Sequence, residues 1–106
     1  GISFNDIEVE AKELVRIHQM YSPEAKIRDI VFDGISGTAP DVSYIWAKQA
    51  APFKNIVFRN VDVSALVECV NAEVTIDGGL FRKKPLSSKE LQDRISNIEK
   101  NKNLLH

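Results

Sequence analysis

Two stretches of this 106-residue sequence decide its fold. They are Lys26-Ile27-Arg28-Asp29-Ile30-Val31-Phe32-Asp33-Gly34-Ile35-Ser36 and Pro52-Phe53-Lys54-Asn55-Ile56-Val57-Phe58-Arg59-Asn60-Val61-Asp62. Both contain Asp or Asn, then Ile-Val-Phe, a charged residue, Gly or Asn, and a β-branched residue. The same frame fits residues 2–9 and, more weakly, residues 74–78. The sequence is therefore built from repeats of roughly 20–30 residues, which is typical of stacked arrays.

Each repeat has the alternation of a β-strand. Apolar residues two positions apart, such as Ile30 and Phe32, point to one side of such a strand. Two positions further on, all four repeats carry a residue that tolerates a left-handed backbone: Asp6, Gly34, Asn60 and Gly78. We therefore expect a tight bend at the same point of every repeat, with a left-handed or bend conformation at Asn60.

A second, shorter strand follows in three of the repeats, at residues 15–18, 44–46 and 67–70. No helical pattern separates the strands. Short parallel strands without crossover helices predict an all-β, single-stranded right-handed parallel β-helix of about three to four coils. The predicted division places these coils in residues 1–84 and a capping helix with a tail in residues 85–106.

The predicted C-terminal cap rests on a helix-start signal. The run Ser87-Ser88-Lys89-Glu90 has the pattern of a capping box, with Ser87 as the N-cap. Leu91, Ile95 and Ile98 then form an apolar stripe at helical spacing. We predict a helix over about residues 88–100, packed on the last coil or on the flank of the β-helix.

The N-terminal end has no comparable cap. Ile2, Phe4 and Ile7 lie on the apolar side of the first strand, and an open end exposes unpaired backbone as well as core. We expect either that further coils precede residue 1 or that another chain covers this end. Self-association through this end is the prediction for the chain on its own.

Composition and charge exclude several classes of function. The net charge of −1 gives no basic excess for nucleic acid, and no apolar run reaches the ~18 residues of a membrane span. The single cysteine, Cys69, excludes an internal disulfide and a multi-cysteine zinc site, and we expect it to be a small buried residue. The only histidines are His18 and His106, so neither a metal site nor a cofactor is predicted.

A family resemblance follows from residues 15–18 and 26–35. They resemble the C-terminal coils of family 28 glycoside hydrolases, the polygalacturonases, which carry an Arg-Ile-Lys strand followed by a coil of the pattern Asn-Ile-x-Phe-x-Asn-Ile. Arg16 matches the arginine, and His18 stands where the family has lysine. The resemblance covers about residues 1–81 and implies that Arg16 binds substrate carboxylates. It also implies a pectin-type substrate and an extracellular or periplasmic location, since such a polymer is too large to enter a cell.

The resemblance implies that catalysis lies outside this chain. The family's catalytic aspartates lie in Asn-Thr-Asp and Asp-Asp motifs, and these motifs and its Gly-His-Gly are absent here. Glycoside hydrolysis needs two carboxylates about 5–9.5 Å apart, and the best candidates, Glu8 and Glu10, fall on a solvated strand face. We predict a C-terminal fragment of a polysaccharide-degrading enzyme that is inactive alone. The alternative is a non-catalytic carbohydrate-binding or scaffold module.

The best functional signal lies on the second strands. If Ile17, Ile45 and Cys69 face inward, then Arg16, Tyr44 and Glu68 form one outward row, with His18 and Trp46 in a second. Arginine pairs bidentately with carboxylates, and aromatic rings offer a flat apolar face to a sugar ring. The predicted substrate-binding residues are therefore Arg16, His18, Tyr44 and Trp46. The alternative is that Tyr44 and Trp46 pack under the C-terminal helix or a loop.

Overall fold

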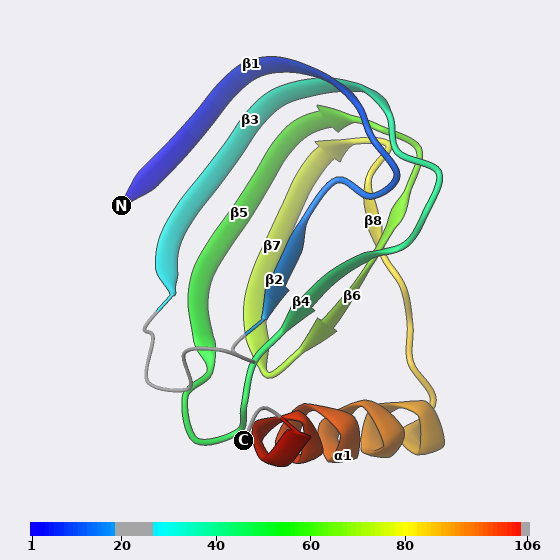
Figure 1. Cartoon of the computed structure of the whole chain (residues 1–106). Helices are drawn as coiled ribbons and strands as arrows, with labels where there is room; N and C mark the ends of the chain where they lie inside the picture. Colours follow the sequence, from blue (N-terminus) through cyan, green and yellow to red (C-terminus); the bar gives the residue numbers. More distant parts are fainter. Residues whose placement is uncertain (19–26, 105–106) are drawn as a thin grey trace.

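The computed structural model describes residues 1–18 and 27–104, and it describes side chains at residues 1–17 and 27–100. Within these ranges the chain forms eight strands followed by one helix (Figure 1). The strands are β1 (Ile2–Glu10), β2 (Arg16–His18), β3 (Arg28–Thr38), β4 (Ser43–Trp46), β5 (Phe53–Asp62), β6 (Leu66–Val70), β7 (Ala72–Gly79) and β8 (Arg82–Lys83). The helix is α1 (Ser88–Leu104).

Successive strands alternate between two sheets. The odd-numbered strands form one four-stranded parallel sheet in the order β1-β3-β5-β7, and the even-numbered strands form another in the order β2-β4-β6-β8. The odd-numbered strands are longer and curve over the even-numbered ones (Figure 1). Each repeat thus supplies one long and one short strand, and the core lies between the two sheets.

The predicted single-stranded right-handed parallel β-helix is wrong. The strands form two separate four-stranded parallel sheets instead of a closed solenoid, and with α1 they make a compact domain of 38 × 29 × 21 Å. The reason is that the spacing of the repeated apolar residues indicates only which residues stack on one another. This spacing does not determine whether the segments between the strands form further strands that would close the two sheets into a solenoid.

The predicted stacking register is confirmed. Ile2, Ile30, Ile56 and Val74 pair across the four long strands, and so do the residues at the Phe4 position two places later. The rings of Phe4 and Phe32 stack at 5.1 Å between centroids, and those of Phe32 and Phe58 at 4.7 Å. Phe58 is fully buried, whereas Phe4 is 39% exposed at the end of the stack. Burial therefore increases from the first long strand toward the third.

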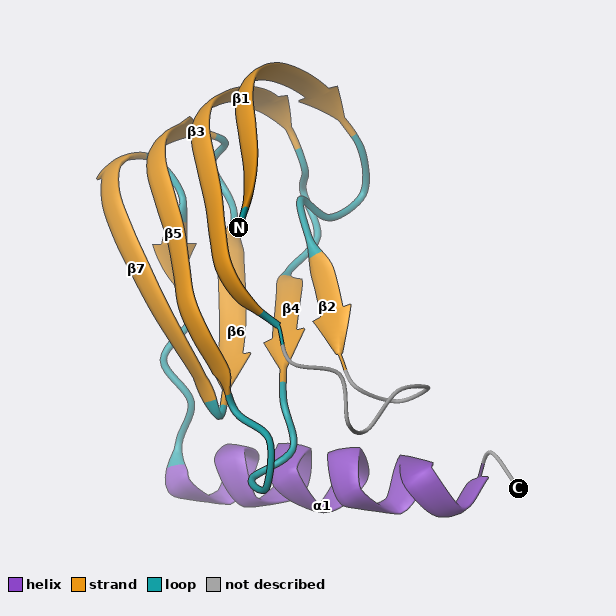
Figure 2. Ribbon diagram, turned by 90° about the vertical axis from the view of Figure 1, so that its left-hand side faces the viewer, coloured by secondary structure: helices purple, strands orange, loops and turns teal. Residues whose placement is uncertain are grey.

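The helix predicted over residues 88–100 is confirmed and extends to Leu104. Its capping box forms as expected, because the Glu90 amide donates to Ser87 Oγ at 3.1 Å and the Ser87 amide donates to Glu90 Oε1 at 3.2 Å. Ile98 of the apolar stripe is buried. Seen from the side, α1 runs across the lower end of the domain, beneath the even-numbered strands (Figure 2).

The bends predicted in every repeat are also confirmed. All four predicted positions have positive φ: Asp6 at 53°, Gly34 at 72°, Asn60 at 51° and Gly78 at 74°. The Asn60 side-chain Nδ2 donates to Asp33 Oδ1 of the neighbouring repeat at 3.3 Å. A side-chain hydrogen bond thus links the bend residue of the third repeat to the residue just before the bend of the second.

This geometry leads to a prediction at Asn60. Replacing Asn60 with Val should lower the unfolding free energy by roughly 1–3 kcal/mol, because a β-branched residue is strained at positive φ. Replacing it with Gly should cost much less, since glycine adopts this conformation freely. Thermal melts of the two variants check the difference, and equal stability would contradict the assigned bend.

Candidate functional site

The register predicted for the rows of residues on the short strands is confirmed. Arg16 pairs with Tyr44 in the register of β2 and β4, and Tyr44 pairs with Glu68 in that of β4 and β6. Their neighbours Ile17, Ile45 and Cys69 form the inward row, and Ile45 is fully buried. Strand periodicity therefore places Arg16 and Tyr44 next to each other on the outer face of the second sheet.

A surface hollow of about 400 Å³ lies at this point. It is lined by Glu13, Arg16, Pro40, Asp41, Val42 and Tyr44. The Arg16 guanidinium lies over the Tyr44 ring, with Cζ 6.0 Å from the ring centroid, which is the geometry of a cation–π contact. Arg16 Nε also forms an ion pair with Glu13 Oε1 at 3.0 Å, and the Arg16 side chain remains 58% exposed. The guanidinium is thus held in place while much of it stays open to solvent.

The chemistry of this hollow is that of a polar recognition site. A guanidinium has five N–H donors, so the ion pair of Arg16 with Glu13 leaves donors for an acidic ligand. Asp41 offers acceptor oxygens, and the Tyr44 ring offers a flat apolar surface with a hydroxyl at its edge. Such a set suits a ligand that carries a carboxylate, hydroxyl groups and an apolar ring face.

The other two predicted site residues lie outside this lining. Trp46 packs edge-on against Tyr44, with centroids 4.8 Å apart and an interplanar angle of 66°. Its indole Nε1 is buried and has no hydrogen-bond acceptor among the residues that the structure describes. Trp46 therefore packs beside the Tyr44 ring on the same face of β4. His18 pairs with Trp46 in the strand register, but its side chain falls outside the described part of the chain.

Sequence reasoning missed four of the lining residues, which are Glu13, Pro40, Asp41 and Val42. These residues come from the connections between β1 and β2 and between β3 and β4, where strand periodicity does not apply. The one available signal was the position of Glu13, three residues before Arg16. The hollow is therefore built from two regular strand residues and from loop residues that no repeat pattern predicts.

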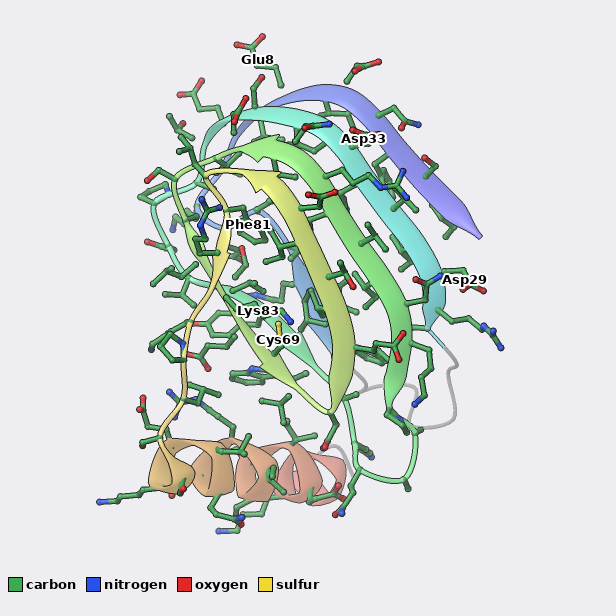
Figure 3. All side chains as sticks on the ribbon, turned by 180° about the vertical axis from the view of Figure 1, so that it is seen from behind. Glu8, Asp29, Asp33, Cys69, Phe81 and Lys83 are labelled. Carbon is green, nitrogen blue, oxygen red and sulfur yellow. The ribbon has the colours of Figure 1, made fainter. Side chains whose placement is uncertain are left out.

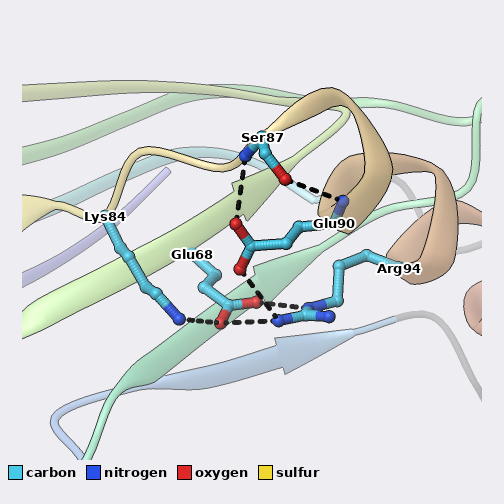
Figure 4. Close-up of polar contacts among 5 residues, drawn as sticks. All are labelled: Glu68, Lys84, Ser87, Glu90 and Arg94. Carbon is cyan, nitrogen blue, oxygen red and sulfur yellow. Dashed lines mark hydrogen bonds and ion pairs between the residues drawn. The ribbon is translucent and has the colours of Figure 1, made fainter.

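Further along the row, Glu68 lies under the helix and is closed to ligands. Its carboxylate accepts hydrogen bonds from Arg94 Nε at 2.9 Å and Lys84 Nζ at 3.2 Å (Figure 4). Burial by itself would raise the pKa of Glu68, but the bonds and charges of Arg94 and Lys84 outweigh it and hold the pKa below its usual value. Glu68 therefore fastens the helix and its preceding segment to β6.

The remaining candidate nucleophile and carboxylates are outside the hollow. Glu8 and Glu10 are exposed on β1, and Figure 3 shows Glu8 projecting from the outer edge of the domain. Burial raises the pKa of the half-buried Cys69 to about 11, although the charge of Lys83 opposes this. The thiol is thus protonated at neutral pH and a poor nucleophile.

The described part of the chain offers neither a metal site nor a membrane-spanning helix. No group of three or more His, Cys, Asp or Glu residues is arranged there to hold a metal ion. Its one helix, α1, lacks the apolar length that a membrane crossing requires.

Comparison with known proteins gives no relative. No family model matches the chain, and no curated protein or solved structure matches it either. The likeness to family 28 glycoside hydrolases therefore stays a prediction from the sequence.

Proposed function

We propose that this chain binds an acidic saccharide without cleaving it, as part of a polygalacturonase-like glycoside hydrolase that acts outside the cell or in the periplasm. The observation that carries the proposal is the exposed Arg16 guanidinium held over the Tyr44 ring in the surface hollow. In this proposal the uronate carboxylate binds Arg16, and the sugar ring lies against Tyr44.

The energetics of such a site indicate weak binding. A hydrogen bond to a charged group contributes about 1.5–3 kcal/mol, and an aromatic contact adds about 0.5–1.5 kcal/mol. Because association also costs translational and rotational freedom, a short oligosaccharide should bind with a Kd of about 1 mM. A longer polymer that reaches further residues would bind more tightly.

The described carboxyl groups with a shifted pKa are not candidates for the general acid of a glycosidase. A glycosidase needs a general acid whose pKa is raised. Where the pKa of a described carboxyl group is shifted, the shift is downward, at Asp29, Glu68 and Glu90. The cause at Asp29 is a hydrogen bond from the Asn55 side chain, and at Glu90 it is one from the backbone of Ser87. These groups are stabilised in the charged form, which cannot donate a proton.

Calorimetric titration with a galacturonate oligomer tests the proposal. We expect binding to the acidic oligomer, weaker binding to a neutral galactose oligomer of the same length, and about tenfold loss of affinity in Arg16→Gln. The matched control is Arg59→Gln, because Arg59 is exposed on β5 of the other sheet. Equal binding of the two oligomers, or an equal loss in the control, would contradict the proposal.

A non-catalytic carbohydrate-binding or scaffold module is the second candidate. It is favoured by the absence of the family's catalytic motifs from this sequence. The two candidates differ in whether a polypeptide containing this chain also carries Asn-Thr-Asp and Asp-Asp motifs. Both predict that the 106-residue chain releases no reducing sugar from polygalacturonate.

A further inference from the structure

The tight connection between β7 and β8 fixes where two basic residues leave the core. Gly78 and Gly79 both have positive φ, at 74° and 83°, and a Cβ on Gly79 would collide with the backbone of β5. Phe81 follows this turn and is fully buried between the sheets. The path of the chain is therefore held on both sides of the connection, and Arg82 and Lys83 come directly after it.

A hollow of about 560 Å³ lies between β7 and β8, the last strands of the two sheets. It is lined by Val74, Thr75, Ile76 and Gly78 of β7 and by Arg82 and Lys83 of β8. Val74 is only 5% exposed and Ile76 is half-buried, so the β7 side of the hollow offers apolar surface. The chain continues from β8 into α1, and no described residue of α1 lines the hollow. Its volume falls within the range of about 300–1,000 Å³ that is typical of small-molecule sites.

The Arg82 guanidinium is held in place without being neutralised. Its Nη1 donates to the carbonyl oxygens of Gly79 at 2.7 Å and Phe81 at 2.9 Å. These acceptors carry no net charge, and no carboxylate among the described residues forms an ion pair with Arg82. Because a guanidinium has five N–H donors, those on Nε and Nη2 remain for a bound anion.

Lys83 adds a second positive charge to the same hollow. Its register partner in β6 is fully buried, so Lys83 occupies a position in the inward row of the short strands. Its charge opposes the rise in the pKa of the Cys69 thiol, the next inward residue of β6 (Figure 3). Among the described residues Lys83 has no acidic partner, whereas Lys84 is paired with Glu68. An inward lysine can protect a sheet edge from association, but such protection explains neither the fixed Arg82 nor the hollow.

We propose that the hollow between β7 and β8 binds a small acid with an apolar body. Its carboxylate binds Arg82 and Lys83, and its apolar chain or ring packs against the β7 side of the hollow. A guanidinium matches a carboxylate through two parallel hydrogen bonds, and the lysine adds a point charge. The apolar lining favours such an acid over a bare inorganic anion, because burial of the apolar body adds to the affinity. This inference does not depend on saccharide binding, since Arg16 lies on β2 at the other end of the strand order.

Titration of the isotopically labelled chain with hexanoate tests the site. We expect hexanoate to bind at least about tenfold more tightly than acetate, because acetate lacks the apolar chain. It should also bind about tenfold more tightly than hexanamide, which has the chain but no charge, and more tightly than inorganic phosphate. The amide shift changes should centre on Thr75, Ile76, Gly78 and Lys83.

Lys83→Gln is the informative variant, because Lys83 is exposed and its removal leaves the bonds of Arg82 to the preceding turn intact. It should weaken hexanoate binding about tenfold, since it removes one of the two charges. Lys89→Gln is the matched control. Lys89 is exposed on α1, outside the hollow, and its replacement should change the affinity by less than about twofold. Circular dichroism establishes that both variants are folded.

Four results would overturn the inference. They are hexanamide or phosphate binding as tightly as hexanoate, equal effects of Lys83→Gln and Lys89→Gln, shift changes that lie away from β7 and β8, and no binding of hexanoate. Sedimentation equilibrium identifies the role of Lys83 in the last case. A lysine that only protects the sheet edge would leave hexanoate unbound, and Lys83→Gln would then increase self-association.

Discussion

Replacing Phe58 with alanine is expected to lower the unfolding free energy by about 3–5 kcal/mol. Phe58 is fully buried between the sheets, with the Phe32 ring 4.7 Å away on one side and the Phe81 ring 5.0 Å away on another. Removing it leaves a cavity in the centre of the core and breaks the ring stack that links the repeats. Urea denaturation followed by circular dichroism measures the loss.

Phe4→Ala is the matched control for this experiment. Phe4 occupies the same position in the first repeat but stacks on Phe32 alone and is 39% exposed. We expect it to cost less than about 1.5 kcal/mol, because it creates no enclosed cavity. Similar losses for Phe4→Ala and Phe58→Ala would mean that the core is not centred on the third long strand.

Replacing Glu68 with glutamine is expected to lower the unfolding free energy by about 1–3 kcal/mol. The change keeps the shape of the side chain but removes the charge that Arg94 and Lys84 share. The loss should be smaller than for a fully buried ion pair, because water reaches both basic partners. Glu90→Gln is the control, since Glu90 is more exposed and its Oε2 lies 3.9 Å from Arg94 Nη2, and it should cost less than Glu68→Gln.

The contribution of Glu68 should depend on pH in one direction. Its pKa is lower in the folded chain than its ordinary value of 4.5, despite the opposing effect of burial, because Arg94 and Lys84 stabilise the charged form. A carboxyl group whose pKa is lowered by folding stabilises the fold at pH values above its pKa in the unfolded chain. This stabilisation is lost as the pH falls through its pKa in the folded chain. The difference between the original chain and Glu68→Gln should therefore be full at pH about 7 and shrink in acid. A stability difference between the two chains that grows in acid would contradict the stabilising role assigned to the charged Glu68.

Much of the local structure could be predicted from the sequence because it depends on local residue chemistry. The positive φ of Asn60 follows from the backbone freedom of asparagine, and the helix start at Ser88 follows from the capping box before it. The pairing of Ile30 with Ile56 follows from the repeat spacing. The division into two separate sheets was not predictable in this way, because it depends on how segments between strands pack.

The same distinction between local and long-range contacts applies to the residues of the candidate site. Arg16 and Tyr44 could be predicted because they occupy equivalent positions on neighbouring strands. Glu68 continues that row, yet the helix covers it through Arg94, which is 26 residues away in the sequence. No local pattern predicts such a distant pairing, and the same holds for the approach of Asp41 to Arg16.

The most direct test of the account is to follow the amide resonances of the isotopically labelled chain during titration with a galacturonate oligomer. The account predicts that shift changes centre on Arg16, Tyr44 and Asp41, and that Arg16→Gln strongly reduces them at the same oligomer concentration. No change at these residues, or changes confined to the opposite sheet, would contradict the claim that this hollow binds an acidic saccharide.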